Sequence, residues 1–480
     1  MKVISEISGA CLYANKGTQN IKVSIDIDTT QDIKSSFTSE PIHYCFMIDI
    51  SKLDGKSNLV NSMEAKNLND FGVYTKKDRL RTVLNTFIND TLYLFKEEDN
   101  ISMIAYDESV YKVFTNQKKS DKENIKKCID TLLNHKSDTD YNNISTCLGV
   151  AKNVIDSQRD KYGKNKIVVL TDTKPSFCEN DFGKIVDTEE NVIKATKEIV
   201  KLNIALDCIC LGSSDEIEQG NYEFAYKLIE ISNGRAYTIE EPELINLHLS
   251  DSIRDSHNSS IYNAKLTLMF NQGVEVGEYF SVSEPIRYFG KMETELVSKK
   301  FGIRSFDIEL PELKDNSIYN YLMEVKVPTT CIDIDNPRYK DGKVLPIMIA
   351  KLKYETINNA KKEIVDKSYN IEIKLTEDIT QLDVHRGVIE GHYQICLAKK
   401  YSDLFLDANR KKDLQKMREY GIETANIYEE LGLYDEARTI KRYFTDVLKG
   451  KTLTQREMNV ISKTSSTATP KNRGTRRREW

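Results

Sequence analysis

The chain carries the apolar segment His43-Tyr44-Cys45-Phe46-Met47-Ile48-Asp49-Ile50-Ser51, which ends in a carboxylate and a hydroxyl. A short run rich in aromatic and branched residues, followed by a Lys/Asp/Gly/Ser segment, predicts a buried central strand that opens into a loop. Ligands of open α/β sheets bind at the carboxyl ends of the strands. We therefore expect Asp49 and Ser51 to face a ligand, and a hard cation such as Mg²⁺ prefers oxygen atoms of this kind.

Strands and helices alternate around this segment, between residues 41 and 256. Other short apolar runs predict strands at 100–105, 166–170, 205–211 and 234–239, and segments of helical period predict helices at 79–95, 122–133, 146–157, 190–202 and 222–231. The alternation predicts an α/β domain with a mostly parallel sheet and helices on both faces. The stretch 52–77 is longer than an ordinary strand-to-helix connection, so it is either a lid or an insertion of little consequence.

The regions before residue 41 and after residue 256 have a different spacing of apolar residues. Residues 1–40 hold two alternating segments, and residues 257–356 hold several short strands without intervening helices. This pattern predicts an antiparallel β-sandwich that the N-terminal strands join. Residues 357–382 are a linker or a further strand, and residues 383–450 follow the three- and four-residue steps of a small helical hairpin or bundle.

Residues 451–480 form a basic segment rich in Ser and Thr, which we expect to be flexible. Candidate phosphorylation sites in it are Thr464, Thr467, Thr469 and Thr475. A phosphate adds about −1.5 to −2 charges and strong acceptor oxygens, which would suit an Arg-lined phosphopeptide reader. Two other interpretations stay open: a solvated tail without a partner, and loose contact with nucleic acid or an anionic surface.

Composition narrows the class of protein. A net charge of −5 over 480 residues does not indicate that the whole molecule binds nucleic acid. The nine cysteines include no C-x-x-C pair, which indicates reduced thiols. The first residues lack the apolar core of a signal peptide, and no apolar run reaches the roughly 18 residues of a membrane span. We expect a cytoplasmic protein without a membrane partner.

Three segments together resemble the von Willebrand factor type A (vWA) domain. They are Asp49-Ile50-Ser51, the segment Tyr141-Asn142-Asn143-Ile144-Ser145-Thr146 with the apolar helix start after it, and Val168-Val169-Leu170-Thr171-Asp172. The metal-ion-dependent adhesion site (MIDAS) of that family uses a D-x-S-x-S loop, a threonine before an apolar helix, and an aspartate after a strand. The resemblance implies a Rossmann-like fold and a site for Mg²⁺, or for Mn²⁺ or Ca²⁺.

The family's ligands carry over only in part. Asp49, Ser51 and Asp172 match by position, Asn142 stands where the threonine is usual, and Leu53 replaces the second serine. An asparagine amide oxygen can also bind a cation, so the resemblance implies a degenerate MIDAS of Asp49, Ser51, Asn142 and Asp172. The alternative is a vestigial site in which both aspartates only accept backbone N–H groups.

The sequence contains no nucleophile elbow, phosphate-binding loop, H-E-x-x-H or kinase signature, so we expect no enzyme activity. The resemblance implies an intracellular protein-binding scaffold that grips an acidic residue of its partner. The order of the domains also resembles bacterial proteins whose neighbours include Ser/Thr kinases and phosphatases. This suggests a kinase, phosphatase or phosphopeptide reader as partner. Two alternatives are an accessory subunit that presents substrate to an ATP-driven chelatase or remodelling machine, and a purely structural or adhesive protein.

Overall fold

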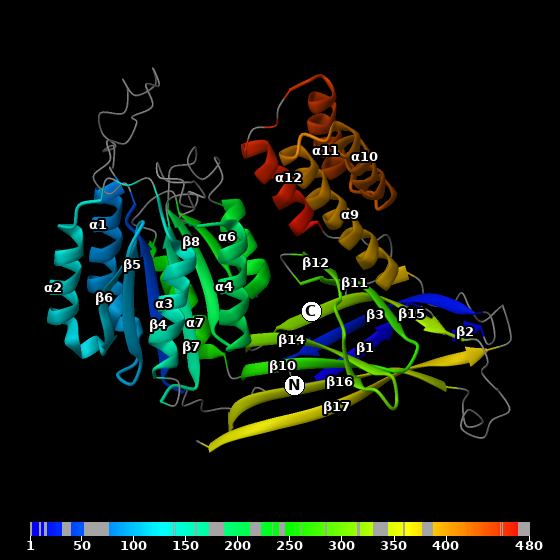
Figure 1. The fold of residues 1–480 in the computed structure, drawn as a ribbon, viewed down its shortest axis with the longest axis horizontal. Helices are drawn as coiled ribbons and strands as arrows, with labels where there is room; N and C mark the ends of the chain where they lie inside the picture. The colour runs from blue at the N-terminus through cyan, green and yellow to red at the C-terminus, as the bar shows by residue number, and fades with distance from the viewer. Residues whose placement is uncertain are drawn as a thin grey trace.

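The fold consists of an α/β domain, a pair of β-sheets and a helical bundle, as the computed structural model in Figure 1 shows. The structure describes residues 2–8, 11–13, 17–30, 40–51, 76–137, 139, 141–158, 161–171, 187–211, 222–232, 234–239, 245–259, 261–283, 286–313, 317–329, 344–358, 361–376, 387–451, 453 and 455–468.

The α/β domain is built on a sheet of six strands in the order β6-β5-β4-β7-β8-β9. The strands are β4 (Ile42–Asp49), β5 (Asn100–Tyr106), β6 (Val110–Gln117), β7 (Lys164–Thr171), β8 (Ala205–Leu211) and β9 (Ala236–Ile239). Neighbours are parallel except β5 and β6, which are antiparallel. The predicted mostly parallel sheet is confirmed.

Helices cover both faces of this sheet (Figure 1). They are α1 (Lys76–Thr86), η2 (Phe87–Thr91), η3 (Leu92–Leu94), η4 (Lys119–Asp121), α2 (Lys122–Leu133), α3 (Ile144–Asp156), α4 (Glu189–Lys201), α6 (Tyr222–Ser232) and α7 (Ile245–Asn258). Alternate residues of β4 enter two separate cores: Tyr44 and Phe46 pack on the side of α1, α2 and α7, and Cys45 and Met47 on the side of α3, α4 and α6. The largely apolar sequence of β4 follows from burial on both faces.

The β-rich region consists of two packed sheets. One has the order β1-β3-β15-β11-β12, and the other has the order β13-β14-β10-β16-β17-β2. The strands of the first are β1 (Lys2–Ile7), β3 (Thr18–Asp28), β11 (Glu275–Ser281), β12 (Arg287–Lys291) and β15 (Ile318–Pro328). The strands of the second are β2 (Cys11–Tyr13), β10 (Ile261–Phe270), β13 (Glu295–Ser298), β14 (Ile303–Leu313), β16 (Val344–Asn358) and β17 (Lys361–Thr376).

Both sheets contribute to one apolar core. Val23 and Ile25 of β3 share it with Leu266 and Leu268 of β10, which is the packing of a β-sandwich. The N-terminal strands therefore join the later β-strands, as predicted. Residues 361–376 form the strand β17, so this part of the segment predicted as a linker or further strand is a strand.

The described residues of the helical region form the helices α9 (Gly387–Arg410), α10 (Leu414–Glu430), α11 (Tyr434–Leu448) and α12 (Gln455–Thr467). Gly432, with a φ of 75°, ends α10 in the left-handed conformation that glycine favours. None of the described helices combines the length and the apolar character that crossing a bilayer requires.

The helix α12 corrects the prediction that residues 451–480 are flexible throughout. Its Ile461 is fully buried, and Leu453 and Ala468 beside it are 5% and 4% exposed, in the same core as α9, α10 and α11. The polar composition of the segment concealed this narrow apolar face, which gains its stability from packing on the bundle. Thr464 and Thr467 lie in α12, whereas Thr469 and Thr475 lie outside the described residues.

Candidate functional site

The predicted site lies where β4 ends, in the middle of the parallel sheet. Its neighbours β5 and β7 lie on opposite sides of it, so the connections of the chain diverge there. Such a switch point leaves a crevice at the carboxyl ends of the strands, where ligands of α/β proteins bind. Asp49 and Ser51 are placed at this edge and are 3% and 1% exposed.

The Asp49 carboxylate accepts the hydrogen bonds that hold this edge of the sheet together. Its Oδ1 accepts hydrogen bonds from the Ser51 backbone N–H at 3.0 Å and from the Ser51 hydroxyl at 2.7 Å. Its Oδ2 accepts from Asn142 Nδ2 at 3.2 Å and from the Thr171 hydroxyl at 3.0 Å. Groups from three separated segments thus converge on one buried carboxylate.

Asn142 is held by the start of α3. The next residue, Asn143, caps this helix by accepting a hydrogen bond from the Thr146 backbone N–H, and its own N–H donates to the Asp107 carbonyl at 2.7 Å. Asp187 accepts from the Ser145 backbone N–H at 2.8 Å and fixes the first turn from the other side. The cap and these two bonds orient Asn142 toward Asp49.

The structure therefore brings together Asp49, Ser51 and Asn142 of the predicted set. Asp172 lies outside the described residues, so its predicted role as a ligand stays a prediction. Thr171, which precedes it at the end of β7, was missed by the sequence analysis. The predicted strand ended at residue 170, and only the alternation of side chains along β7 could have indicated that the Thr171 hydroxyl faces Asp49.

The surroundings of Asp49 are poor in solvent. Burial raises the pKa of Tyr106, and the nearby Asp49 carboxylate raises it further. Burial likewise raises the pKa of Cys147, with smaller contributions from Cys45 and Asp49. The negative charge of Asp49 is thus felt at neighbouring side chains, as expected where the effective dielectric constant is low.

The oxygen atoms around Asp49 are of the type that binds divalent cations. Asp49, Ser51, Thr171 and the amide oxygen of Asn142 are hard ligands that suit Mg²⁺, while the described residues contain no group of three His, Cys, Asp or Glu side chains that could hold a metal. In the described arrangement Asn142 turns its NH₂ group to Asp49, so a cation bound there would require rotation of the amide. A single carboxylate supplies little charge, and affinity depends on the charge of the ligands.

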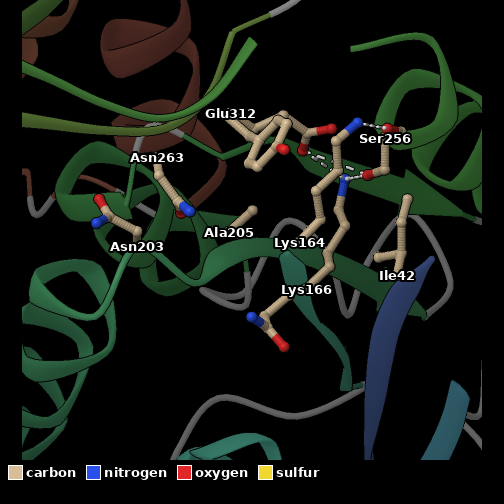
Figure 2. A pocket seen from close by; sticks show the side chains of 10 residues that line it. Ile42, Lys164, Lys166, Asn203, Ala205, Ser256, Asn263 and Glu312 are labelled. Carbon is tan, nitrogen blue, oxygen red and sulfur yellow. Dashed lines mark hydrogen bonds and ion pairs between the residues drawn. The ribbon is translucent and has the colours of Figure 1, made fainter. Parts of the chain in front are cut away.

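A small pocket lies at the opposite end of β7, next to the β-sandwich (Figure 2). Lys166 Nζ is 2.8 Å from Asp207 Oδ2 and 3.5 Å from Glu312 Oε2. Desolvation lowers the pKa of Lys166, but the Asp207 and Glu312 carboxylates outweigh it and raise the pKa above its ordinary value. Lys164 donates to the Ser256 carbonyl at the end of α7 at 2.9 Å. Both lysines thus connect the sheet of the α/β domain to α7, and Lys166 also reaches the sandwich.

Comparisons with known proteins agree with this architecture. The family model for the von Willebrand factor type A domain matches residues 58–174. A von Willebrand factor type A protein from Catenulispora acidiphila is similar in structure, with a TM-score of 0.66 and 14% identity over 97% of each chain. The ArnB paralog VWA2 from Sulfolobus acidocaldarius is similar with a TM-score of 0.52 and 15% identity, over 97% of this chain and 98% of that one. A comparison with curated proteins finds no match.

At this level of identity the structural likeness establishes the fold, and the family match covers residues 58–174 within the α/β domain. The strand order and the helices on both faces of the sheet agree with the family match over residues 58–174. Residues 58–174 thus match the von Willebrand factor type A domain family, and the whole chain, with its β-sandwich and C-terminal helices, shares the fold of a von Willebrand factor type A protein.

Proposed function

We propose that this chain is a non-enzymatic binding protein that uses the edge around Asp49 to grip an acidic side chain of a protein partner. The observation that carries the proposal is the convergence of Ser51, Asn142 and Thr171 on the buried Asp49 carboxylate. These groups come from the loop after β4, from the residue just before the N-cap of α3 and from the last residue of β7. Such loops supply specificity while a rigid sheet holds the central ligand in place.

In the proposed function, Mg²⁺ or Mn²⁺ is held by Asp49, Ser51 and Asn142, together with Asp172. The bound cation would supply an open coordination position for a partner's carboxylate. The residues of the chain hold and orient the cation and exclude most of the solvent around Asp49. With few carboxylates, binding of metal alone is weak, and a partner's carboxylate adds the missing negative charge.

Capture of partners from a cell lysate tests the proposed binding of a protein partner. Wild-type protein on a solid support is incubated with lysate of its native cells, in Mg²⁺ or in a chelator. Asp49→Ala is compared with Asp435→Ala, whose side chain is 83% exposed on α11. We expect captured proteins that are lost in the chelator and with Asp49→Ala but kept with Asp435→Ala. Equal capture under all four conditions would contradict the proposal.

We further propose a signalling context, in which a Ser/Thr kinase modifies the C-terminal segment and a phosphatase or phosphopeptide reader acts on it. Thr467 is exposed at the end of α12, next to the buried Ser465 and Ser466. A phosphate near the C-terminus of a helix is disfavoured by the helix dipole, so modification of Thr467 would loosen the last turn of α12. Intact-mass measurement on protein from native cells tests this directly: absence of phosphate in every growth condition would exclude it.

The alternative is an accessory subunit that presents substrate to an ATP-driven chelatase or remodelling machine. The chain has no phosphate-binding loop of its own, so this role requires a partner ATPase. The same capture experiment separates the two: an ATPase whose hydrolysis rate responds to this protein would favour the alternative.

A further inference from the structure

The strands β13 and β14 form a hairpin whose turn lies at the end of the sandwich opposite the α/β domain. β10 leaves the α/β domain directly after α7, and its register places Phe270, at its far end, opposite Arg304 of β14. The turn of residues 299–302 comes just before this part of β14. The 10 residues of β10 span about 30 Å. The hairpin tip, defined here as residues 296–301, is therefore remote from the candidate site.

The hairpin tip exposes large apolar side chains close together. Leu296 is 52% exposed, Val297 is 58% exposed and Phe301 is 57% exposed. Elsewhere in the described residues, exposed large apolar side chains occur singly along the chain. Single exposed residues of this kind are normal on a protein surface, whereas a group of them marks an interaction site.

The local backbone holds these side chains outside the sandwich. Met292 and Ile308 anchor the base of the hairpin in the sandwich core. Between these anchors, the register of β13 with β14 shifts around Val297, which has no Cα partner on β14. Gly302 closes the turn with a φ of 60°, in the left-handed region that glycine favours. The hairpin tip is thus an apolar projection on an anchored base.

The hairpin tip is also basic. Lys299 and Lys300 are exposed in the turn, and Lys300 Nζ lies 5.3 Å from the centroid of the Phe301 ring. The segment 296–306 contains three basic residues and no acidic one. Of the acidic residues that flank it, Asp307 already forms an ion pair with Lys265 at 2.6 Å. Apolar and cationic groups therefore meet at the same end of the hairpin.

We propose that the hairpin tip docks on an anionic lipid surface. Its apolar side chains enter the interfacial region of the bilayer, while Lys299 and Lys300 contact the anionic headgroups. The apolar stem of a lysine can lie along the inserted residues while its ammonium group stays at headgroup level. Insertion of apolar groups and attraction between basic residues and anionic lipids are the two contributions that a reversible peripheral contact combines.

The shape and charge of the hairpin tip favour lipid over a protein partner. A projecting tip needs a soft surface or a matching pocket, and a bilayer accepts it without a preformed pocket. Such a contact requires no helix that crosses the membrane. The sequence-based expectation of no membrane partner rested on the absence of an apolar span, and the exposure of the tip becomes visible only in the fold. The contact does not depend on the metal site proposed at Asp49.

Co-sedimentation of the full chain with lipid vesicles tests the proposal. Vesicles of phosphatidylcholine alone are compared with vesicles that also contain phosphatidylserine, at low and at high salt. The chain should bind to the phosphatidylserine vesicles at low salt, and high salt should release it, since salt screens the attraction. A wild-type chain that binds neither type of vesicle, or that binds both equally, would overturn the proposal.

Charge reversal locates the contact. Lys299→Glu/Lys300→Glu should weaken binding to phosphatidylserine vesicles about tenfold or more. Lys126→Glu/Lys127→Glu, which reverses two adjacent exposed lysines of α2, is the matched control and should bind more tightly than the tip variant. Equal weakening by both double variants would assign the attraction to the overall charge of the chain and overturn the proposal.

Removal of the apolar contribution gives an independent test. Phe301→Ser should also weaken binding to phosphatidylserine vesicles, whereas Ile364→Ser, at a residue that is 62% exposed on β17, should bind as wild type does. Wild-type binding by Phe301→Ser would contradict insertion of the tip. If the chain ignores vesicles but Phe301→Ser loses a protein captured from native lysate, the hairpin tip serves a protein partner and the lipid proposal is wrong.

Discussion

Asp49 and Asn142 are 93 residues apart in the sequence, yet Asn142 Nδ2 donates to Asp49 Oδ2 at 3.2 Å inside the protein. The contact joins the end of β4 to the start of α3, across the crevice between the central strands. It fixes the position of the Asn142 amide against the Asp49 carboxylate. This amide can offer either its nitrogen or its oxygen.

Removing the Asp49 carboxylate should destabilise the fold. Asp49→Ala leaves the buried donors of Ser51, Asn142 and Thr171 without their acceptor, and we expect a loss of about 2–4 kcal/mol in the free energy of unfolding. Asp49→Asn keeps the volume and one acceptor oxygen, so its loss should be smaller. Urea denaturation measures both variants, and equal stability of Asp49→Ala and wild type would show that these hydrogen bonds contribute nothing.

The buried ion pair between Lys166 of β7 and Asp207 of β8 should stabilise the fold. Lys166 and Asp207 each have 4% of the side chain exposed, and Lys166→Met leaves the Asp207 carboxylate buried without its cation. Breaking such a pair from one side costs about 3–5 kcal/mol. The double variant Lys166→Met/Asp207→Asn removes both charges and should recover part of this loss. A double variant that loses the sum of the two single effects would argue against coupling between the pair.

The free energy of unfolding should decrease at acidic pH, because His43 is buried in its neutral form. Burial lowers the pKa of His43 to about 4, with a smaller effect of Lys118, while the unfolded chain keeps a value near 6.5. Between pH 6.5 and pH 4 the unfolded state binds the proton and the native state does not. Stability therefore falls as the pH decreases through this range, by up to about 3 kcal/mol.

The variant His43→Gln isolates this contribution, because glutamine does not titrate and can still bond to the Ser102 hydroxyl that lies 2.9 Å from His43 Nε2. The difference in unfolding free energy between wild type and His43→Gln should change with pH only below about pH 6.5. A difference that stays constant down to pH 4 would contradict a lowered pKa of His43.

The helix α12 should be protected from hydrogen exchange although its sequence is polar. Ile461 is fully buried against the bundle, so Ile461→Ala should cost about 2–4 kcal/mol locally and raise exchange throughout 455–467. Exposed Thr467→Ala is the control and should leave exchange unchanged in the rest of α12. Immediate exchange of all of 455–467 in the wild-type chain would contradict the packed helix.

Strong periodic segments of the α/β domain were predictable from the sequence. The strand Ala205–Leu211 and the helix Lys122–Leu133 have the predicted bounds, because apolar burial and helical period are unmistakable there. The antiparallel edge strand Val110–Gln117 was missed, since Phe114 alone among its residues is buried and the alternation is weak. The helix Ile245–Asn258 was also missed, as its serines and charges conceal the buried Ile245, Leu249 and Ile253.

The candidate site was predictable in part, because Asp49 and Ser51 follow the strand directly and Asn142 precedes a recognisable helix. The contribution of Thr171 was not, since the side on which a strand residue faces depends on the register of its neighbours. The α12 helix was not predictable either, because its stability comes from tertiary packing.

Titration with Mn²⁺ tests whether the edge around Asp49 binds a divalent cation. The resonance of free Mn²⁺ disappears on binding, so electron paramagnetic resonance counts bound ions without any assay of function. We expect one weak Mn²⁺ site in wild-type protein, from which Mg²⁺ displaces Mn²⁺; Asp49→Ala should abolish this site, while Asp435→Ala leaves it intact. Binding that is identical in wild type and Asp49→Ala, or no binding at millimolar Mn²⁺, would contradict a cation site at Asp49.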